Sequence, residues 1–140
     1  MSAEKRAAEA GRWLGQAVAD LKAARASRDA AIHEWACFQS QQAGDKALKA
    51  LWLEAGHDPW GHSLLRLVQD YPESELADRV RALGDTARLL DKLYIPTRYP
   101  NGLPDLTPAE VYGPSDSDSA IAAAQRIIDL VRGVLGRKMI

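Results

Sequence analysis

The stretch from Trp35 to Trp52 reads WACFQSQQAGDKALKALW and holds the strongest packing signal in this 140-residue chain. Drawn as a helix that turns about 100° per residue, it gathers small residues within an arc of about 60°. They are Ala36, Ala43, Ala47 and Ala50. An adjoining arc of about 80° carries amides and amines. These are Gln39, Gln42, Lys46 and Lys49. The stretch therefore predicts a helix that a neighbouring helix approaches closely, with an ordered polar stripe beside the contact.

Apolar residues recur at intervals of three and four in the rest of the chain, which is the spacing of amphipathic helices. The pattern predicts long helices over about residues 3–26, 31–55, 72–94 and 117–137, and a short helix over about 63–70. No stretch alternates with the period of two that is typical of strands. The sequence therefore predicts a single all-α domain over residues 1–140. Its expected architecture is an up-and-down antiparallel four-helix bundle with an additional short helix.

The third long segment has the clearest periodicity. Its apolar residues step by four, three, four, three and four: Leu76, Val80, Leu83, Ala87, Leu90 and Tyr94. Residues 95–114 follow, with five prolines, two glycines and no regular apolar spacing. We expect this segment to be a loop that is either functional or mobile, because compact bundles rarely contain connections of such length.

Composition limits the kinds of partner that the chain can have. Hydrophobic residues make up 46% of the sequence and charged residues 26%, as in ordinary globular domains. The formal net charge of -1 gives no broad basic face, so any anion site has to be a local cluster. The sequence has no apolar leader and no run of about 18 apolar residues. We expect a cytoplasmic protein that does not enter membranes.

Catalytic and metal-binding patterns are missing from the sequence. The single cysteine, Cys37, excludes an internal disulfide and lies on a predicted buried face, where a thiol stays protonated and inert. None of the three histidines shares a helix face with a second potential metal ligand. We therefore expect no metal, no cofactor and no catalytic residue. His62, between Gly61 and Ser63, is placed to bind an anion or to cap a helix.

The polar stripe of the second helix is the first candidate site. Amides such as that of Gln42 can donate to and accept from the edge of a base. The ammonium groups of Lys46 and Lys49 can attract a phosphate. The alternative is a solvated flank in which Lys46 pairs with Gln42 or with neighbouring acidic groups. The residues alone leave both interpretations open.

The second candidate site is the sequence LYIPTRYP, residues 93–100. Two prolines restrict its backbone, while Tyr94 and Tyr99 can stack on bases and Arg98 can bind phosphate with two hydrogen bonds. Equally, the tyrosines can cover the end of the bundle while Arg98 donates to carbonyl groups at a helix C-terminus. These alternatives also stay open.

Three of these motifs occur together in a known family. The stretches EWACFQSQQAGDKALKALWLEAG (34–56), GHSLLRLV (61–68) and LDKLYIPTRYP (90–100) strongly resemble the HEPN domain in order and spacing. HEPN stands for higher eukaryote and prokaryote nucleotide-binding, and the likeness is to the branch with a YIPTRYP-type motif. The resemblance implies a helical bundle that often forms homodimers and a role around nucleotides or RNA. It also implies a minimal nucleotidyltransferase as partner in a toxin–antitoxin-like pair.

Some HEPN branches are metal-independent ribonucleases, which carry an arginine and, four to six residues later, a histidine near the end of the third long helix. Arg98 lies at about that place, but no histidine follows it in the chain. Arg28 and His33 have the arginine–histidine spacing, but they lie at the entry to the second predicted helix. The resemblance therefore implies a binding domain rather than an enzyme.

The residues that the resemblance marks for nucleotide binding are Gln42, Lys46, Lys49, His62, Tyr94, Arg98 and Tyr99. We expect the lysines and Arg98 to meet at one anion-sized hollow. Two alternatives remain: a ribonuclease that uses His33, His62 or Tyr99 in place of the missing histidine, and a purely structural protein-interaction domain.

Overall fold

The computed structural model describes residues 2–138, with side chains through residue 136, and is helical without strands over that range. The long helices are α1 (Ala3–Asp29), α2 (His33–Glu54) and α7 (Pro114–Lys138). The shorter helices are α3 (Leu64–Gln69), α4 (Ala77–Arg81), α5 (Gly84–Asp91), the 3-10 helix η1 (Pro100–Gly102) and α6 (Pro108–Val111). The predicted all-α fold is confirmed. Over the described range, no helix is both long and apolar enough to cross a bilayer.

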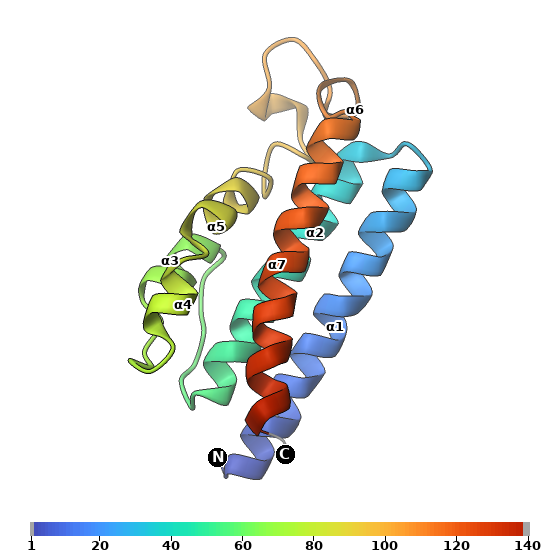
Figure 1. The fold of residues 1–140 in the computed structure, drawn as a ribbon. Coiled ribbons are helices and arrows are strands. Elements are labelled where there is room, and N and C mark those ends of the chain that lie inside the picture. Colours follow the sequence, from blue (N-terminus) through green and yellow to red (C-terminus); the bar gives the residue numbers. More distant parts are fainter. Residues whose placement is uncertain (1, 139–140) are drawn as a thin grey trace.

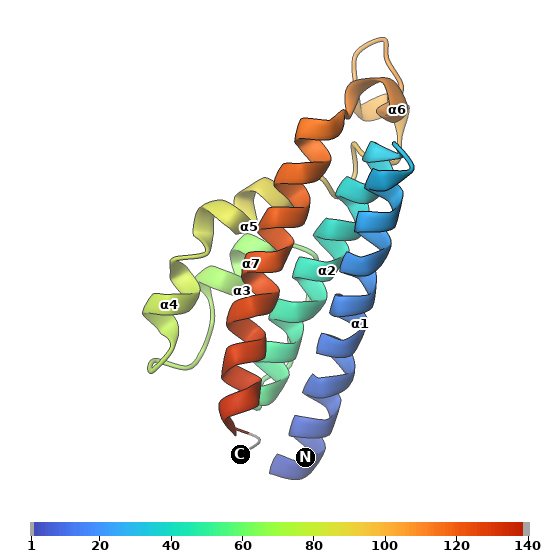
Figure 2. The same cartoon turned by 45° about the vertical axis from the view of Figure 1, so that its right-hand side comes forward.

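Helix α2 lies at the centre of an up-and-down bundle. Helices α1 and α7 pack on it along their lengths, and α3 and α5 pack on another side (Figure 1). The successive segments α4–α5 form the fourth column of the bundle, while α6 and the chain before it cover one end (Figure 2). The start of α1 and the end of α7 lie near each other at the opposite end.

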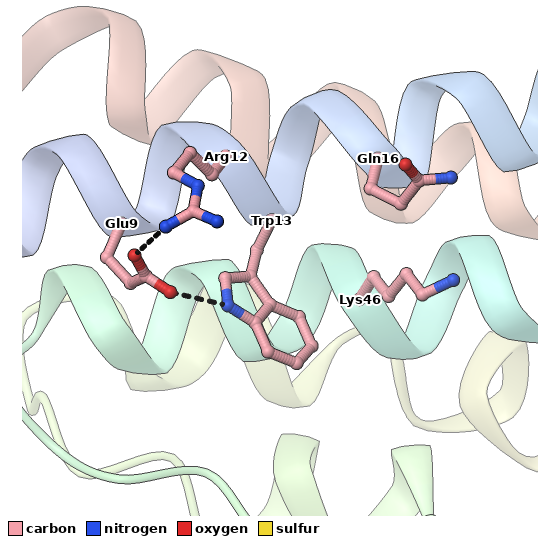
Figure 3. Close-up of a pocket in the computed structure, with 5 residues that line it drawn as sticks. All are labelled: Glu9, Arg12, Trp13, Gln16 and Lys46. Carbon is pink, nitrogen blue, oxygen red and sulfur yellow. Dashed lines mark hydrogen bonds and ion pairs between the residues drawn. The ribbon is translucent and has the colours of Figure 1, made fainter.

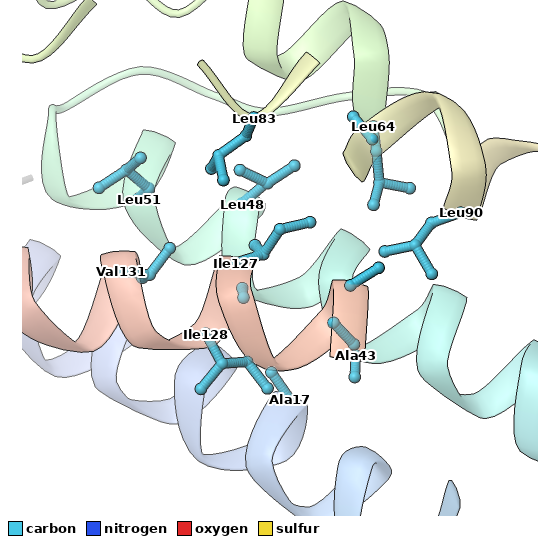
Figure 4. Packing of buried hydrophobic residues seen from close by; sticks show 14 of the residues in the cluster. Ala17, Ala43, Leu48, Leu51, Leu64, Leu83, Leu90, Ile127, Ile128 and Val131 are labelled. Atoms are coloured by element: carbon cyan, nitrogen blue, oxygen red, sulfur yellow. The ribbon is translucent and has the colours of Figure 1, made fainter. Parts of the chain in front are cut away.

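The small residues of α2 allow this central position. Its four seam alanines are all fully buried. A Cβ atom built on Gly44 would lie 2.8 Å from Leu90 Cδ1, 2.9 Å from Leu64 Cδ2 and 3.3 Å from Ile127 Cδ1. These side chains belong to the leucine- and isoleucine-rich core drawn in Figure 4. The prediction that neighbouring helices approach this helix closely is therefore confirmed at Gly44.

The expected continuous helix over 72–94 is wrong. The chain is irregular over 72–73 and forms turns over 74–76 and again at 82–83, so that α4 and α5 are separate helices. Gly84, a poor helix former, begins the second of them. The segment still buries the predicted apolar positions Val80, Leu83, Ala87 and Leu90, while Leu76 and Tyr94 at its ends are half-buried. The apolar spacing therefore predicted the buried face correctly but not the bend.

The expected loop over 95–114 contains two short helices. The second, α6, begins with a capping box in which Thr107 Oγ1 accepts from Glu110 N, and the Glu110 side chain accepts from Thr107 N. Helix α7 begins at Pro114 rather than near residue 117, and α1 extends to Asp29 rather than residue 26. The turn between α1 and α2 contains Ala31, whose backbone is in the left-handed region with φ of 61°.

Asp91 connects α5 to the start of α3. Its Oδ1 accepts from Leu64 N at 2.7 Å, and its Oδ2 accepts from Leu65 N at 3.0 Å and from Ser63 Oγ at 2.9 Å. The first amides of a helix have no partner within the helix, so an ionised carboxylate is well suited to accept from them. This contact fixes the loop before α3 against the end of α5.

We expect Asp91→Ala to lower the free energy of unfolding by about 2–3 kcal/mol, because buried amide and hydroxyl groups lose a charged acceptor. Urea denaturation followed by circular dichroism measures this change. Asp85→Ala is the matched control, since its carboxylate is fully exposed and only pairs with Arg88; it should leave the midpoint unchanged. Equal midpoints for wild type and Asp91→Ala would contradict the tertiary capping role.

We expect Gly44→Val to lower the free energy of unfolding by about 1–3 kcal/mol, since the added atoms overpack the contact with Leu90 and Leu64. Gly15→Val on α1 is the control, because a Cβ atom there would meet nothing within 4 Å. The control should show no loss in the same urea titration. A Gly44 variant as stable as this control would show that α2 tolerates larger residues at its centre.

Candidate functional site

Arg98 lies among three aromatic rings, one of which belongs to α2. Its Cζ atom is 4.2 Å from the centre of the Phe38 ring, 4.9 Å from that of Tyr94 and 5.2 Å from that of Tyr99. Within about 6 Å, a cation is attracted to the negative face of an aromatic ring. Trp35 adds an edge contact to Phe38, with 5.9 Å between ring centres. We call Phe38, Tyr94, Arg98 and Tyr99 the arginine cluster.

The backbone after α5 places Arg98 in this cluster. Thr97 is 1% exposed and its Oγ1 donates to Leu93 O at 2.6 Å, while Arg98 N donates to Ile95 O at 3.1 Å. The guanidinium folds back, so that Nε and Nη2 donate to Tyr94 O at 3.0 and 2.8 Å. This carbonyl contact is one of the two arrangements that the sequence left open. No hydrogen bond from Nη1 to another residue is found within 2–136, so its donors stay available to a ligand.

His62 joins the arginine cluster from the segment between α2 and α3. Its ring stacks on Tyr94, with 5.2 Å between centres and an angle of 19° between planes. The next residue, Ser63, is bound by Asp91, which lies three residues before Tyr94 in the sequence. The Asp91 cap therefore explains why a histidine about thirty residues away in sequence lies against this tyrosine.

Gln42 and Lys46 line a shallow groove beside the cluster. The groove has a volume of about 260 Å³, and its walls include Trp35, Phe38 and Asp20. Lys46 Nζ is paired with Asp20 Oδ2 on α1. The Gln42 side-chain amide donates to Gln41 Oε1 at 2.8 Å. The groove touches the arginine cluster through Phe38, but its lysine is already neutralised.

Lys46 also lies beside a second hollow, of about 570 Å³, between α1 and α2 (Figure 3). There Glu9 accepts from Arg12 at 3.0 Å and from the Trp13 indole at 3.2 Å. Lys46 extends away from Arg12 in this view. Both cations that line the hollow are thus paired with carboxylates, which makes it a poor anion site.

Lys49 is largely buried, although it also lines a hollow of about 670 Å³ between α1 and α2. The residue is 9% exposed, and its Nζ is 3.0 Å from Oδ2 of Asp45, which is 5% exposed. Burial raises the pKa of the Asp45 carboxyl, while the hydrogen bond and charge of Lys49 and the charges of His62 and Lys46 lower it. Asp45 Oδ1 has no hydrogen-bond partner within the described side chains. We therefore assign Lys49 a structural role.

The structure brings together four of the seven predicted site residues: His62, Tyr94, Arg98 and Tyr99. It places Gln42 and Lys46 in the adjoining groove. Lys49 belongs to neither the arginine cluster nor this groove. The expected meeting of both lysines with Arg98 at a single hollow is therefore wrong. The physical reason is that each lysine has a closer carboxylate, Lys46 on α1 and Lys49 within α2.

The pair with the ribonuclease spacing is held elsewhere. His33 Nδ1 is 2.8 Å from Ser117 Oγ on α7, and Arg28 Nη1 is 3.6 Å from Asp118 Oδ1. Cys37 is fully buried, and burial raises the pKa of its thiol to about 12. Within residues 2–136, no three His, Cys, Asp or Glu side chains group closely enough to hold a metal.

A family profile, that of the HEPN domain, matches residues 10–134. The chain belongs to the HEPN domain family. A search of curated proteins finds no match.

Solved structures are similar to this HEPN domain over nearly its whole length. TT1696 from Thermus thermophilus is 41% identical over 89% of this chain and 96% of its own, with a TM-score of 0.83. ST0689, an archaeal HEPN homologue, is 35% identical over 90% and 97%, with a TM-score of 0.74. The HEPN domain protein tm0613 from Thermotoga maritima is 29% identical over 90% and 98%, with a TM-score of 0.67.

Sequence reasoning missed Phe38 as a member of the site of this HEPN domain. A signal was available, because Phe38 precedes Gln42 by one helical turn and therefore shares its face. The pairing of Lys46 with Asp20 had no comparable local signal, since 26 residues separate the two in sequence.

The raised pKa of Asp45 predicts that the stability of the domain falls as the pH rises. The protonated Asp45 carboxyl is favoured in the folded state, where its pKa is raised. Asp45 therefore contributes fully to stability at pH values below 3.8, its ordinary pKa, and this contribution is lost as the pH rises through the folded-state pKa. Asp45→Asn mimics the neutral form. At pH 7 it should therefore exceed wild type in free energy of unfolding, by about 1.4 kcal/mol for each unit of raised pKa.

The measurement is urea denaturation between pH 3.5 and pH 7.5. Lys49→Met is the informative companion, because the Lys49 ammonium lowers the pKa of Asp45; without it, the loss of stability with rising pH should become larger. If Asp45→Asn is instead less stable than wild type at neutral pH and equally pH-dependent, the ionised pair stabilises the fold and our account of Asp45 is wrong.

Proposed function

We propose that this HEPN domain binds a nucleotide or an RNA end, with a phosphate on Arg98. The observation that carries the proposal is the environment of the guanidinium: three rings contact it, one carbonyl accepts from Nε and Nη2, and Nη1 has no hydrogen-bond partner within residues 2–136. A guanidinium with a fixed plane and unused donors suits a phosphate oxygen.

The other predicted residues have distinct roles in this proposal. Tyr99, which is 48% exposed, and the stacked pair of His62 and Tyr94 offer aromatic surface for a base. Gln42 and Lys46 line the adjoining groove, where the Gln42 amide can form hydrogen bonds with the edge of a base. Lys49 is paired with Asp45 on α2 and is assigned no contact with the ligand. No residue is assigned a catalytic role.

The proposed partners follow from family membership. We propose that the domain forms a homodimer in the cytoplasm and acts with a minimal nucleotidyltransferase in a toxin–antitoxin-like pair. Exposed apolar side chains near the groove support a protein contact there: Trp35 is 46% exposed and Ile32 is 44% exposed.

Calorimetric titration with ATP, GTP and a short single-stranded RNA tests the binding site. We expect Arg98→Ala to weaken binding by about 10- to 100-fold, which corresponds to the loss of charge-assisted hydrogen bonds. Arg98→Lys should restore little, because an ammonium cannot reproduce the planar stacking. Arg88→Ala is the control, since Arg88 is an exposed arginine of α5 that pairs with Asp85.

Equal affinities for wild type and Arg98→Ala, or no binding by either protein, would contradict the proposal. The same RNA samples, run on a gel, test the ribonuclease alternative. Its supporting observation is that His62 and Arg98 both contact Tyr94. Cleavage that falls by about 10²- to 10⁴-fold in His62→Ala, but not in His33→Ala, would establish that alternative.

A further inference from the structure

Trp60 is the most exposed large apolar side chain within residues 2–136, with 83% of its surface accessible. It lies in the segment between α2 and α3, which runs back along the bundle from the end of α2 (Figure 1). Pro59 precedes it, and Gly61 follows in the left-handed region with φ of 85°. This backbone holds the indole outward instead of packing it on the core.

A small hollow of about 140 Å³ lies beside Trp60. Its lining includes Trp52, Trp60, His62, Arg66, Leu67 and Asp70. Trp52 forms a rigid wall, because its Nε1 donates to Leu67 O at 2.9 Å and its ring makes an edge contact with Tyr71. The volume suits one planar ring system rather than a whole nucleotide.

Polar groups lie beside the hollow in positions to bind the edge of such a ring. Arg66 Nε and Asp70 Oδ2 are 3.7 Å apart, and their side chains are 75% and 59% exposed. At that distance the two groups form only a loose ion pair, so both can donate to or accept from a ligand. A base edge presents donors and acceptors together, which matches a guanidinium beside a carboxylate.

His62 connects this hollow to the arginine cluster. The His62 ring lines the hollow and also stacks on Tyr94, whose ring in turn lies under Arg98. The Arg98 Cζ atom lies 4.9 Å from the centre of the Tyr94 ring, which in turn lies 5.2 Å from the centre of the His62 ring. These two distances together limit how far Arg98 can be from His62. One ligand that carries a base and a phosphate can reach both places.

We propose that the hollow binds a nucleobase, which stacks on Trp60 while Arg98 holds a phosphate of the same ligand. This inference rests on the proposed function and adds the base site to it. The ligand class is a nucleobase joined through its sugar to phosphate, supplied either by a free nucleotide or by single-stranded RNA. Exposed aromatic side chains bind bases of any sequence in this way, because every base has a flat face.

The experiment is a calorimetric titration of the full chain with pyrophosphate, AMP, ATP and tetraadenylate RNA. We expect Trp60→Ala to weaken binding of the base-containing ligands by about 10- to 100-fold and to leave pyrophosphate binding unchanged. Trp60→Phe keeps a flat ring and should restore most of the affinity. A higher affinity for tetraadenylate than for ATP identifies RNA as the source, and the reverse identifies the free nucleotide.

Tryptophan fluorescence gives a second readout. Base-containing ligands should quench the emission of wild type and of Trp13→Phe, which removes an indole from α1 outside the site. Because Trp52 also lines the hollow, the informative variant is Trp60→Ala, in which quenching should need about 10- to 100-fold more ligand. Quenching of Trp60→Ala at the same ligand concentrations as wild type would overturn the inference. So would an emission shift that needs only higher protein concentration and disappears in Trp60→Phe, because Trp60 would then contact a second copy of the chain.

The titrations separate failure of this inference from failure of the proposed function. If Arg98→Ala weakens binding of every ligand while Trp60→Ala changes none, the base site is wrong and the phosphate site stands. If Arg98→Ala changes none of the affinities, or if no ligand binds wild type, the proposed function fails and the base site fails with it.

Discussion

The burial of α2 on several sides is the constraint on which the rest of the structure depends. Gly44 and the alanine seam let neighbouring side chains reach the helix closely, but the same contacts remove water from its polar residues. Buried polar groups need internal partners. Ser40 therefore bonds to the Ala36 carbonyl, and Asp45 pairs with Lys49. In the polar stripe, Lys49 and Gln42 thus bond to other residues of α2, while Lys46 bonds to Asp20 on α1.

The fold was predictable because it depends on apolar spacing, and spacing is a local property of the sequence. The central apolar positions of 72–94, from Val80 to Leu90, are buried although the helix bends at 82–83, since a bend changes direction without rotating the apolar face away from the core. The capping box of Thr107 and Glu110 was readable in the same way and was missed because the prolines of 95–114 suggested a loop.

The candidate site was predictable only where its parts are close in sequence. Tyr94, Arg98 and Tyr99 are within one short turn, and the structure groups them as the motif suggested. His62 comes to them through the Asp91 cap, and Phe38 comes through the packing of the whole bundle. The partner of Lys46 is on α1, so only the relative position of two helices reveals that its charge is neutralised.

The neutralised lysines change what kind of recognition this surface can perform. An open row of ammonium groups would attract any anion by charge alone, with strong dependence on salt. Here Lys46 and Lys49 face carboxylates, and Arg98 is held by rings and by one carbonyl. If the site binds a nucleotide as we propose, recognition depends on the fixed plane of one guanidinium and on the flat surfaces beside it. Such a ligand would gain from the site only if phosphate and ring were present together in the right geometry, which favours selectivity over strength.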